Sequence, residues 1–184
     1  VIEAIKEHEP KIVAMVHGET ANAQMQPLDQ IGAFCRENEI FFVVDMVATY
    51  GGVETKVDDW KIDIAVAGTQ KCVSVPSGLS LITYNQRVAD YLAGRYQKEL
   101  GLGADARNER FIQSNYLDLS QLEKYWGPER LNHHTEATTM IYGLHEGLRL
   151  LLQEGMENVY ARHRKNDRIL VESLQKMGLE IFGK

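Results

Sequence analysis

The 184 residues are 44% hydrophobic and 25% charged, which is typical of a globular protein with its own core and excludes a disordered chain. The formal net charge of -6, without a long basic tract, excludes a broad nucleic-acid-binding surface. No apolar run approaches the roughly 20 residues that span a membrane, and no secretory signal pattern is found. We therefore expect a cytoplasmic protein with a small-molecule partner, in which Cys35 and Cys72 are reduced thiols.

The N-terminal part of the chain predicts two helices. Val1–His8 is expected to be helical and to end before Pro10. Pro27 opens a second helix, in which apolar side chains recur at helical spacing. The residues of this apolar face are Leu28, Ile31, Phe34 and Cys35.

Four short apolar runs predict buried strands because they are rich in β-branched and aromatic residues. The runs are Ile12–Val16, Ile40–Val44, Ile62–Ala67 and Leu79–Thr83. Strands that are apolar throughout and alternate with helices indicate a parallel or mostly parallel sheet that is covered on both faces. The sequence therefore predicts an α/β fold.

The C-terminal half of the chain predicts mainly helices. We expect them at Arg87–Glu99, Glu136–Gln153 and Met156–Met177, with a glycine-broken loop around 101–103 and a polar connector between the first and the second. Gly155 and Gly178 are expected to end the two long helices. We expect residues 1–150 to form one large domain and residues 151–184 a connecting helix and the start of a small domain, in a piece of a longer polypeptide.

Polar side chains follow three of the predicted strands where each strand ends. They are the segment 17–20, then Asp45, and then Gln70 with Lys71. Ligands bind at the carboxyl ends of strands in such sheets, so these groups are expected to share one crevice. Asp45 and Lys71 are either a structural ion pair or a functional pair, in which burial makes Lys71 a desolvated amine able to form a Schiff base.

Five motifs, in order along the chain, carry a resemblance to a known family. They read VHGETANA, VVDMVATYGG, IDIAVAGTQK, PSGLSLI and LNHHTEATTMIYGLHEGL. They resemble the motifs of class V aminotransferases, which implies fold type I and the cofactor pyridoxal 5'-phosphate (PLP). Within that class the similarity is greatest to ureidoglycine-glyoxylate aminotransferases and to alanine-glyoxylate and serine-pyruvate aminotransferases.

The resemblance implies a role for each polar group at the strand ends. Lys71 would hold PLP covalently and move the substrate proton, while Asp45 would keep the pyridine nitrogen protonated. Val47, on the same side of an extended backbone as Asp45, would pack on the cofactor ring. Thr20 would reach the phenolic oxygen of PLP and Gln70 would lie near its phosphate. The ring-stacking residue, the glycine-rich phosphate loop and the arginine for the substrate carboxylate would fall outside these 184 residues.

The segment that contains His133, His134 and Thr135 has more than one interpretation. Two adjacent histidines suggest a metal, but neighbours on an extended segment point to opposite faces and no further ligand stands at a typical spacing, so we expect no metal. Thr135, at the start of a long helix, is either a plain N-cap or a ligand of the cofactor phosphate. The resemblance implies the second role, with the segment crossing to the other subunit of a homodimer.

Asn132 differs from the residue typical of alanine-glyoxylate aminotransferases, and this difference bears on the substrate. Alanine-glyoxylate enzymes resemble this sequence but carry tyrosine there, whereas ureidoglycine-glyoxylate aminotransferases carry asparagine. An amide offers donors and an acceptor, which suits a ureido group; the alternative is a turn residue before the helix. The resemblance thus implies amino transfer to glyoxylate from (S)-ureidoglycine in purine (allantoin) catabolism, or from alanine or serine. A non-catalytic binding or dimerisation domain on the same scaffold stays open.

Overall fold

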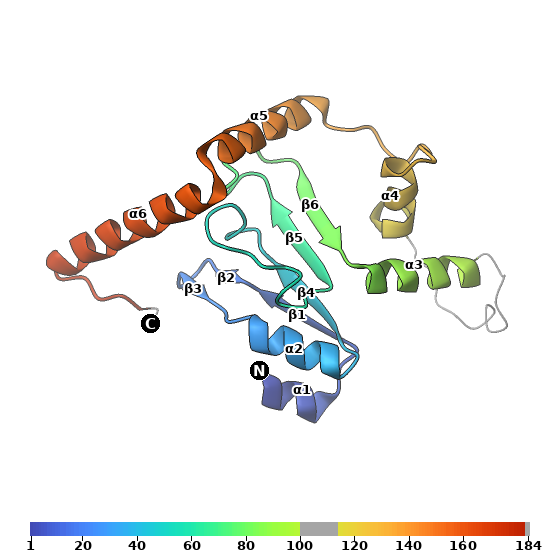
Figure 1. Cartoon of the computed structure of the whole chain (residues 1–184), viewed down its shortest axis with the longest axis horizontal. Helices are drawn as coiled ribbons and strands as arrows, with labels where there is room; N and C mark the ends of the chain where they lie inside the picture. The colour runs from blue at the N-terminus through green and yellow to red at the C-terminus, as the bar shows by residue number, and fades with distance from the viewer. Residues whose placement is uncertain (100–113, 183–184) are drawn as a thin grey trace. The chain divides into compact units, whose positions relative to one another are not determined.

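The computed structural model describes residues 1–99 and 114–182 (Figure 1). The chain divides into two compact units, the first formed by Val1–Thr83 with Ala137–Lys184 and the second by Tyr84–Glu136. The expected division at residue 150 concerns the domains of the whole protein and stays a prediction. The loop expected around residues 101–103 lies outside the described residues.

The first unit is built on a four-stranded sheet with the strand order β1-β4-β5-β6 (Figure 1). The strands are β1 (Ile12–Val16), β4 (Phe41–Asp45), β5 (Ile64–Gly68) and β6 (Ser80–Tyr84). β1 pairs with β4 in parallel, and so does β4 with β5, whereas Figure 1 shows β6 running opposite to β5. The sheet is therefore mostly parallel, which confirms the predicted fold class, and each of the four expected strands is found within two residues of its predicted bounds.

Helix α2 (Asp29–Glu37) supplies much of the cover of this sheet. Its predicted apolar face is buried at Ile31 and Cys35, and it packs with Phe42 and Val44 of β4 in one core cluster. Gly32 lies on the same face, where an added Cβ would overlap the Trp60 carbonyl oxygen. The hydrophobic spacing of the sequence thus places the helix correctly on the sheet.

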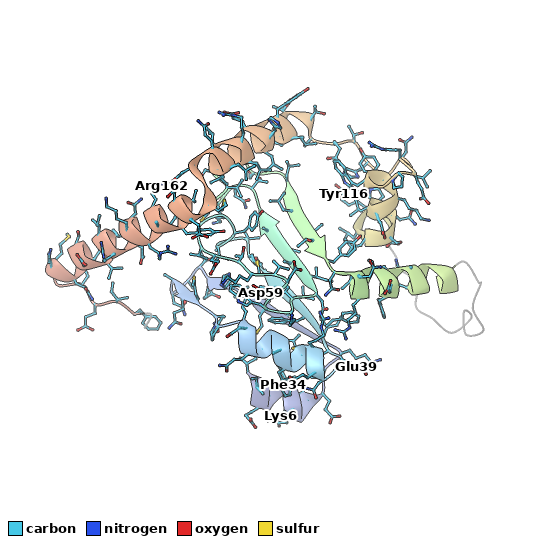
Figure 2. All side chains as sticks on the ribbon, viewed as in Figure 1. Lys6, Phe34, Glu39, Asp59, Tyr116 and Arg162 are labelled. Carbon is cyan, nitrogen blue, oxygen red and sulfur yellow. The ribbon has the colours of Figure 1, made fainter. Side chains whose placement is uncertain are left out.

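Helix α1 (Ile2–His8) confirms the first predicted helix and packs beside α2. Its Ile5 is buried in the same core cluster. The ammonium of Lys6 lies 5.8 Å from the centroid of the Phe34 ring in α2, and Figure 2 labels both side chains. This cation–π contact joins the solvent-facing parts of the two helices.

A hairpin of two very short strands, β2 (Gly18–Glu19) and β3 (Gln24–Met25), was not predicted. The strands pair in antiparallel fashion, and the turn between them contains Thr20. Strands of two residues leave no hydrophobic alternation for sequence analysis to detect.

The two long C-terminal helices are α5 (Thr138–Glu154) and α6 (Met156–Lys176). Gly155 and Gly178 have φ angles of 83° and 86°, the left-handed conformation that favours glycine at a helix end, which confirms the two predicted stops. Gly147 of α5 lies against the Val75 side chain and the Val73 carbonyl oxygen. A side chain at position 147 would push α5 away from the loop that follows β5.

The second unit contains α3 (Gln86–Glu99), a 3-10 turn at Asn115–Leu117 and α4 (Leu119–Trp126). A polar connector without regular structure was expected here, and this prediction is wrong for Leu119–Trp126, which form α4. Asp118 caps this helix by accepting a hydrogen bond from the Ser120 amide, and its carboxylate also pairs with Arg95 of α3 at 2.6 Å. The Asp-x-Ser start of this helix was a cap signal in the sequence.

Candidate active site at the carboxyl edge of the sheet

The strand register places three segments at one edge of the first unit. Val16 of β1 is opposite Asp45 of β4, and Asp45 is opposite Val66 of β5. Because these strands are parallel, the residues that follow each of them leave the sheet at the same edge. The polar groups after β1, β4 and β5 therefore leave the sheet at one edge, while the single crevice expected for them stays a prediction.

Asp45 is the last residue of β4, and among the described residues its carboxylate has no cationic partner. Its Oδ1 accepts a hydrogen bond of 2.8 Å from the Val47 amide. Within residues 1–99 and 114–182, no lysine, arginine or histidine forms an ion pair with it. The extended backbone expected from Asp45 to Val47 is wrong, because Val47–Thr49 form a turn. The hydrogen bond from the Val47 amide to the Asp45 side chain belongs to this turn.

Lys71 lies three residues beyond the end of β5, in a loop that is fixed by its own hydrogen bonds. The buried Thr69 donates its hydroxyl hydrogen to the Pro76 carbonyl at 2.8 Å, and the Ser74 amide donates to the Lys71 carbonyl at 2.9 Å. The Lys71 side chain is exposed and, in the described part of the chain, forms no hydrogen bond or ion pair.

These observations decide one alternative and correct another. The structural ion pair between Asp45 and Lys71 is not formed, so the two charges at this edge stay separate. The burial expected for Lys71 is wrong for this chain, because its side chain is exposed.

The Lys71 loop and the turn after Asp45 contact one another. The Cys72 Sγ lies 3.5 Å from the Ala48 carbonyl oxygen. A Cβ on Gly68 would come within 2.5 Å of the Gln70 Oε1 and 3.2 Å of the Val47 Cγ1, so a side chain at position 68 would displace the end of Gln70. Gln70 and Val47, both predicted for the site, are thereby brought together around Gly68.

Cys72 is a half-buried thiol rather than a nucleophile. Burial raises its pKa, and the neighbouring Lys71 ammonium only partly opposes that shift. A groove of about 680 Å³ runs past Cys72, Thr49 and the β2–β3 hairpin to α6. Neither Asp45 nor Lys71 lines this groove, so it is not the site defined by the two charges.

Two buried residues lie at this edge, His17 and Thr49. His17 opens the polar segment 17–20 that was expected here, although no role was assigned to it, and Thr49 was not predicted. His17 is 2% exposed, and its Nδ1 lies 2.9 Å from the Thr49 Oγ1. Its amide donates to the Asp45 carbonyl at 2.8 Å, and its carbonyl accepts from the Gln26 amide at 2.8 Å. The only sequence signal was a histidine at the first position after a predicted strand.

Asn132 and Thr135 belong to the second unit, in the irregular segment after α4, and both are exposed. Thr135 does not start the long helix, because α5 begins at Thr138 with Ala137 as its N-cap. The N-cap alternative for Thr135 is therefore wrong. Whether it binds a phosphate stays a prediction.

The two histidines between Asn132 and Thr135 contact each other. The Nδ1 atoms of His133 and His134 are 2.8 Å apart, so the expectation that the rings point to opposite faces is wrong. The His134 Nε2 also lies 2.8 Å from the Glu136 Oε1, and its ring packs against the Tyr125 ring. Figure 2 labels Tyr116, whose ring stacks on His133. Among the described residues, no three His, Cys, Asp or Glu side chains gather as a metal site.

The edge therefore offers a carboxylate and a primary amine that have no ion-pair partner among residues 1–99 and 114–182. An amine of this kind can attack a carbonyl carbon, and a carboxylate can stabilise a positive charge nearby. These are the two groups that a carbonyl-bearing, cationic heterocycle requires of a protein.

Comparison with known proteins shows the family of this chain. The chain belongs to the class-V aminotransferase family, whose sequence model matches residues 1–184. Its sequence is 55% identical to that of the (S)-ureidoglycine–glyoxylate transaminase of Bacillus subtilis (strain 168). The match covers all of this chain and 45% of that protein. The crystal structure of the Bacillus subtilis ureidoglycine-glyoxylate aminotransferase matches the whole chain with a TM-score of 0.88 at 55% identity, over 44% of its own length.

A second solved structure, alanine–glyoxylate aminotransferase from Nostoc sp., matches with a TM-score of 0.86 at 35% identity, over all of this chain and 45% of that one. These matches confirm the predicted family. The chain spans less than half the length of the curated relatives that it matches. In the described part of the chain, no helix combines the length and apolarity that crossing a bilayer needs.

Proposed function

We propose that this chain carries the cofactor-binding centre of a PLP-dependent aminotransferase. The observation that supports this most directly is that Asp45, at the end of β4, and Lys71, in the loop after the neighbouring parallel strand β5, do not neutralise each other. Because Lys71 is exposed and Asp45 is partly exposed, water reaches both charges, and the fold does not use either of them to neutralise the other. Two charges that are kept separate at a ligand-binding edge are available to a third group.

The residues at this edge fit PLP. Lys71 supplies the amine that binds the cofactor aldehyde, and Asp45 supplies an anion for the pyridine nitrogen. Gln70 and Val47 lie around Gly68, where an added Cβ would fill the space between them. Thr20, exposed in the hairpin turn after β1, is available to the phenolic oxygen. When bound, the cofactor acts as an electron sink for the carbanion formed at the substrate α-carbon.

The protein's part in the reaction follows from these groups. With the cofactor bound, the Lys71 Nζ would accept the proton of the substrate α-carbon and would hold it for the second proton transfer. The Asp45 carboxylate would stabilise a proton on the ring nitrogen of the cofactor, so that the ring could accept electrons. Because the Val47 amide fixes one oxygen of Asp45, the carboxylate stays oriented through both steps.

We propose glyoxylate as the amino acceptor and (S)-ureidoglycine as the donor, in purine (allantoin) catabolism. Support comes from Asn132, whose amide can match a ureido group, and from the 55% identity to a transaminase named for that pair of substrates. Alanine or serine as donor is the alternative, supported by the 35% identity to an alanine–glyoxylate enzyme. Steady-state comparison of the three donors with the full-length protein distinguishes them, and a clear preference for alanine would contradict the first.

We further propose a cytoplasmic homodimer in which Thr135 binds the cofactor phosphate of the other subunit. The free thiols of Cys35 and Cys72 agree with a reducing compartment. Sedimentation of the full-length protein tests the dimer. Mixing inactive Lys71→Ala with inactive Thr135→Ala subunits tests sharing, because hybrid dimers would regain part of the activity in one of their two sites.

A direct test of the centre is whether PLP attaches to Lys71. The full-length protein incubated with PLP is expected to gain visible absorbance, and borohydride reduction is expected to fix the cofactor to the peptide containing Lys71. Protein that stays colourless, with the reduced label absent from that peptide, would favour the alternative of a non-catalytic domain on this scaffold.

A further inference from the structure

His17 is not among the groups proposed to touch the cofactor, yet it is one of the least exposed polar residues in the described chain, with 2% of its surface accessible. It lies between β1 and β2, directly beside the end of β4. The Trp60 ring meets it edge-on with centroids 5.4 Å apart. Burial also lowers the pKa of the imidazole, which keeps the ring neutral at pH 7.

The backbone of His17 joins two of the segments that carry proposed cofactor contacts. Its amide donates to the carbonyl of Asp45, and its carbonyl accepts from the amide of Gln26, just after β3. The first bond continues the pairing of β1 with β4 by one residue. The second closes the base of the hairpin whose turn contains Thr20.

The side chain of His17 reaches the turn that orients the Asp45 carboxylate. Its Nδ1 lies 2.9 Å from the Thr49 Oγ1, which in turn lies 3.4 Å from the Met46 carbonyl oxygen. For both contacts to be hydrogen bonds, the Thr49 hydroxyl must donate to Met46, because a carbonyl only accepts, and the His17 Nδ1–H must donate to Thr49.

The neighbouring residue shows how closely this contact is packed. A Cβ on Gly18 would come within 2.6 Å of the Thr49 Cγ2, so the Thr49 side chain has little freedom to turn away from His17. The turn at Val47–Thr49 is thus fixed at its far end by His17, while at its near end the Val47 amide holds the Asp45 Oδ1. A turn fixed at both ends sets the direction of the carboxylate.

We propose that His17 is a positioning residue for Asp45, acting through the Thr49 hydroxyl and the turn that follows β4. This inference rests on the proposed function, since it concerns how Asp45 meets the cofactor. His17 itself needs no contact with cofactor or substrate. Its loss would leave Asp45 chemically intact but free to turn away from the ring nitrogen.

The test uses the full-length protein loaded with PLP and two variants that cut the same bond, His17→Leu and Thr49→Val. Each is expected to weaken PLP binding, measured by equilibrium titration of the visible absorbance, by about tenfold, the usual effect of one buried hydrogen bond. Thr49→Val keeps the buried imidazole in place, so it decides the question if His17→Leu does not fold. His17→Asn, whose amide can donate near the position of Nδ1, is expected to restore binding to within about threefold of wild type.

Double variants separate positioning from a general structural role. If His17 and Thr49 act through Asp45, then Thr49→Val added to Asp45→Asn is expected to weaken PLP binding no further. A full additional tenfold loss in that background would overturn the proposal in favour of a general structural role, and so would unchanged binding in both single variants. Wild-type protein that binds no PLP would instead overturn the proposed function, and the inference with it.

Discussion

The two ends of the same parallel strands treat an aspartate in opposite ways. At the amino end, Asp63 is 1% exposed, accepts from Arg36 at 2.9 Å through Oδ1 and accepts from the Phe42 amide at 2.8 Å through Oδ2. At the carboxyl end, Asp45 is partly exposed and accepts from the Val47 amide with Oδ1. Asp45 is the last residue of β4, and Asp63 directly precedes β5. Asp63 has an arginine partner and Asp45 has a backbone amide partner.

This contrast separates a structural carboxylate from a functional one. The two oxygens of Asp63 are bound by groups that hold β4 and α2 in place, so its charge is already used within the fold. Asp45 holds its own turn and keeps a charge that the described residues leave without an ion-pair partner. A carboxylate of the second kind is the better candidate for chemistry, because it can meet a ligand without losing a structural bond.

Lys71→Ala is the change expected to have the largest effect at the carboxyl end. Turnover by the full-length protein should fall by about 10³-fold, because the variant lacks the amine that moves the substrate proton. Lys11→Ala, at the amino end just before β1, is the matched control and should keep wild-type turnover. Turnover within tenfold of wild type in Lys71→Ala would remove this lysine from the proposed mechanism.

The two aspartates should respond to the same substitution in opposite ways. Asp45→Asn is expected to lower kcat by about 10²-fold, the cost of losing a preorganised charge, with little change in thermal stability. Asp63→Asn is expected to lower the free energy of unfolding by about 2 kcal/mol, since hydrogen bonds to a charged group are lost. Steady-state kinetics and denaturant unfolding of both variants measure the difference. Similar profiles for the two variants would contradict the distinction drawn between the ends of the sheet.

Asn132→Tyr probes selectivity rather than chemistry. The ratio of kcat/KM for ureidoglycine to that for alanine should fall by about tenfold, because one side-chain hydrogen bond to the ureido group is lost. PLP absorbance should stay unchanged. Asn38→Tyr, on the exposed end of α2, is a suitable control. An unchanged ratio would show that Asn132 does not read the donor.

The smallest effect concerns pH and again the carboxyl edge. Burial lowers the pKa of His17 in the folded protein below its ordinary value of about 6.5, so the unfolded state binds its proton more readily. The stability that His17 contributes is therefore complete above pH 6.5 and decreases as the pH falls through and below that value. His17→Asn should flatten this part of the stability curve, whereas His8→Asn, at an exposed position, should not. Parallel curves for wild type and His17→Asn would contradict this assignment.

The sequence predicted the sheet because each strand is a continuous apolar run. The burial expected for all four strands is found in β4 and β5 but is wrong for β1 and β6, whose residues are exposed or half-buried in this chain. The strand ends then followed, so Asp45 and the Lys71 loop could be assigned to one edge. The β2–β3 hairpin and α4 were missed, since a two-residue strand has no period and the Asp118 cap opens a helix of only eight residues. Elements this short contain too few residues to show a hydrophobic periodicity that sequence analysis can detect.

The candidate site was predicted less completely than the fold. The contact between His17 and Thr49 joins residues 32 positions apart, and nothing in either local sequence indicates it. The exposure of Lys71 depends on which other parts of the chain cover its loop, and the turn at Val47 depends on the Asp45 side chain itself. Such features follow from tertiary packing, which residue spacing does not encode.

The close approach of Gly147 to Val73 and Val75 also has a consequence for biosynthesis. The loop that presents Lys71 rests on a helix whose contact residue is translated 76 residues later (147 minus 71). Lys71 therefore leaves the exit tunnel well before α5 does, and its loop packs against Gly147 only once α5 has emerged. Docking of the Lys71 loop on α5 is thereby a late event in the life of the nascent chain.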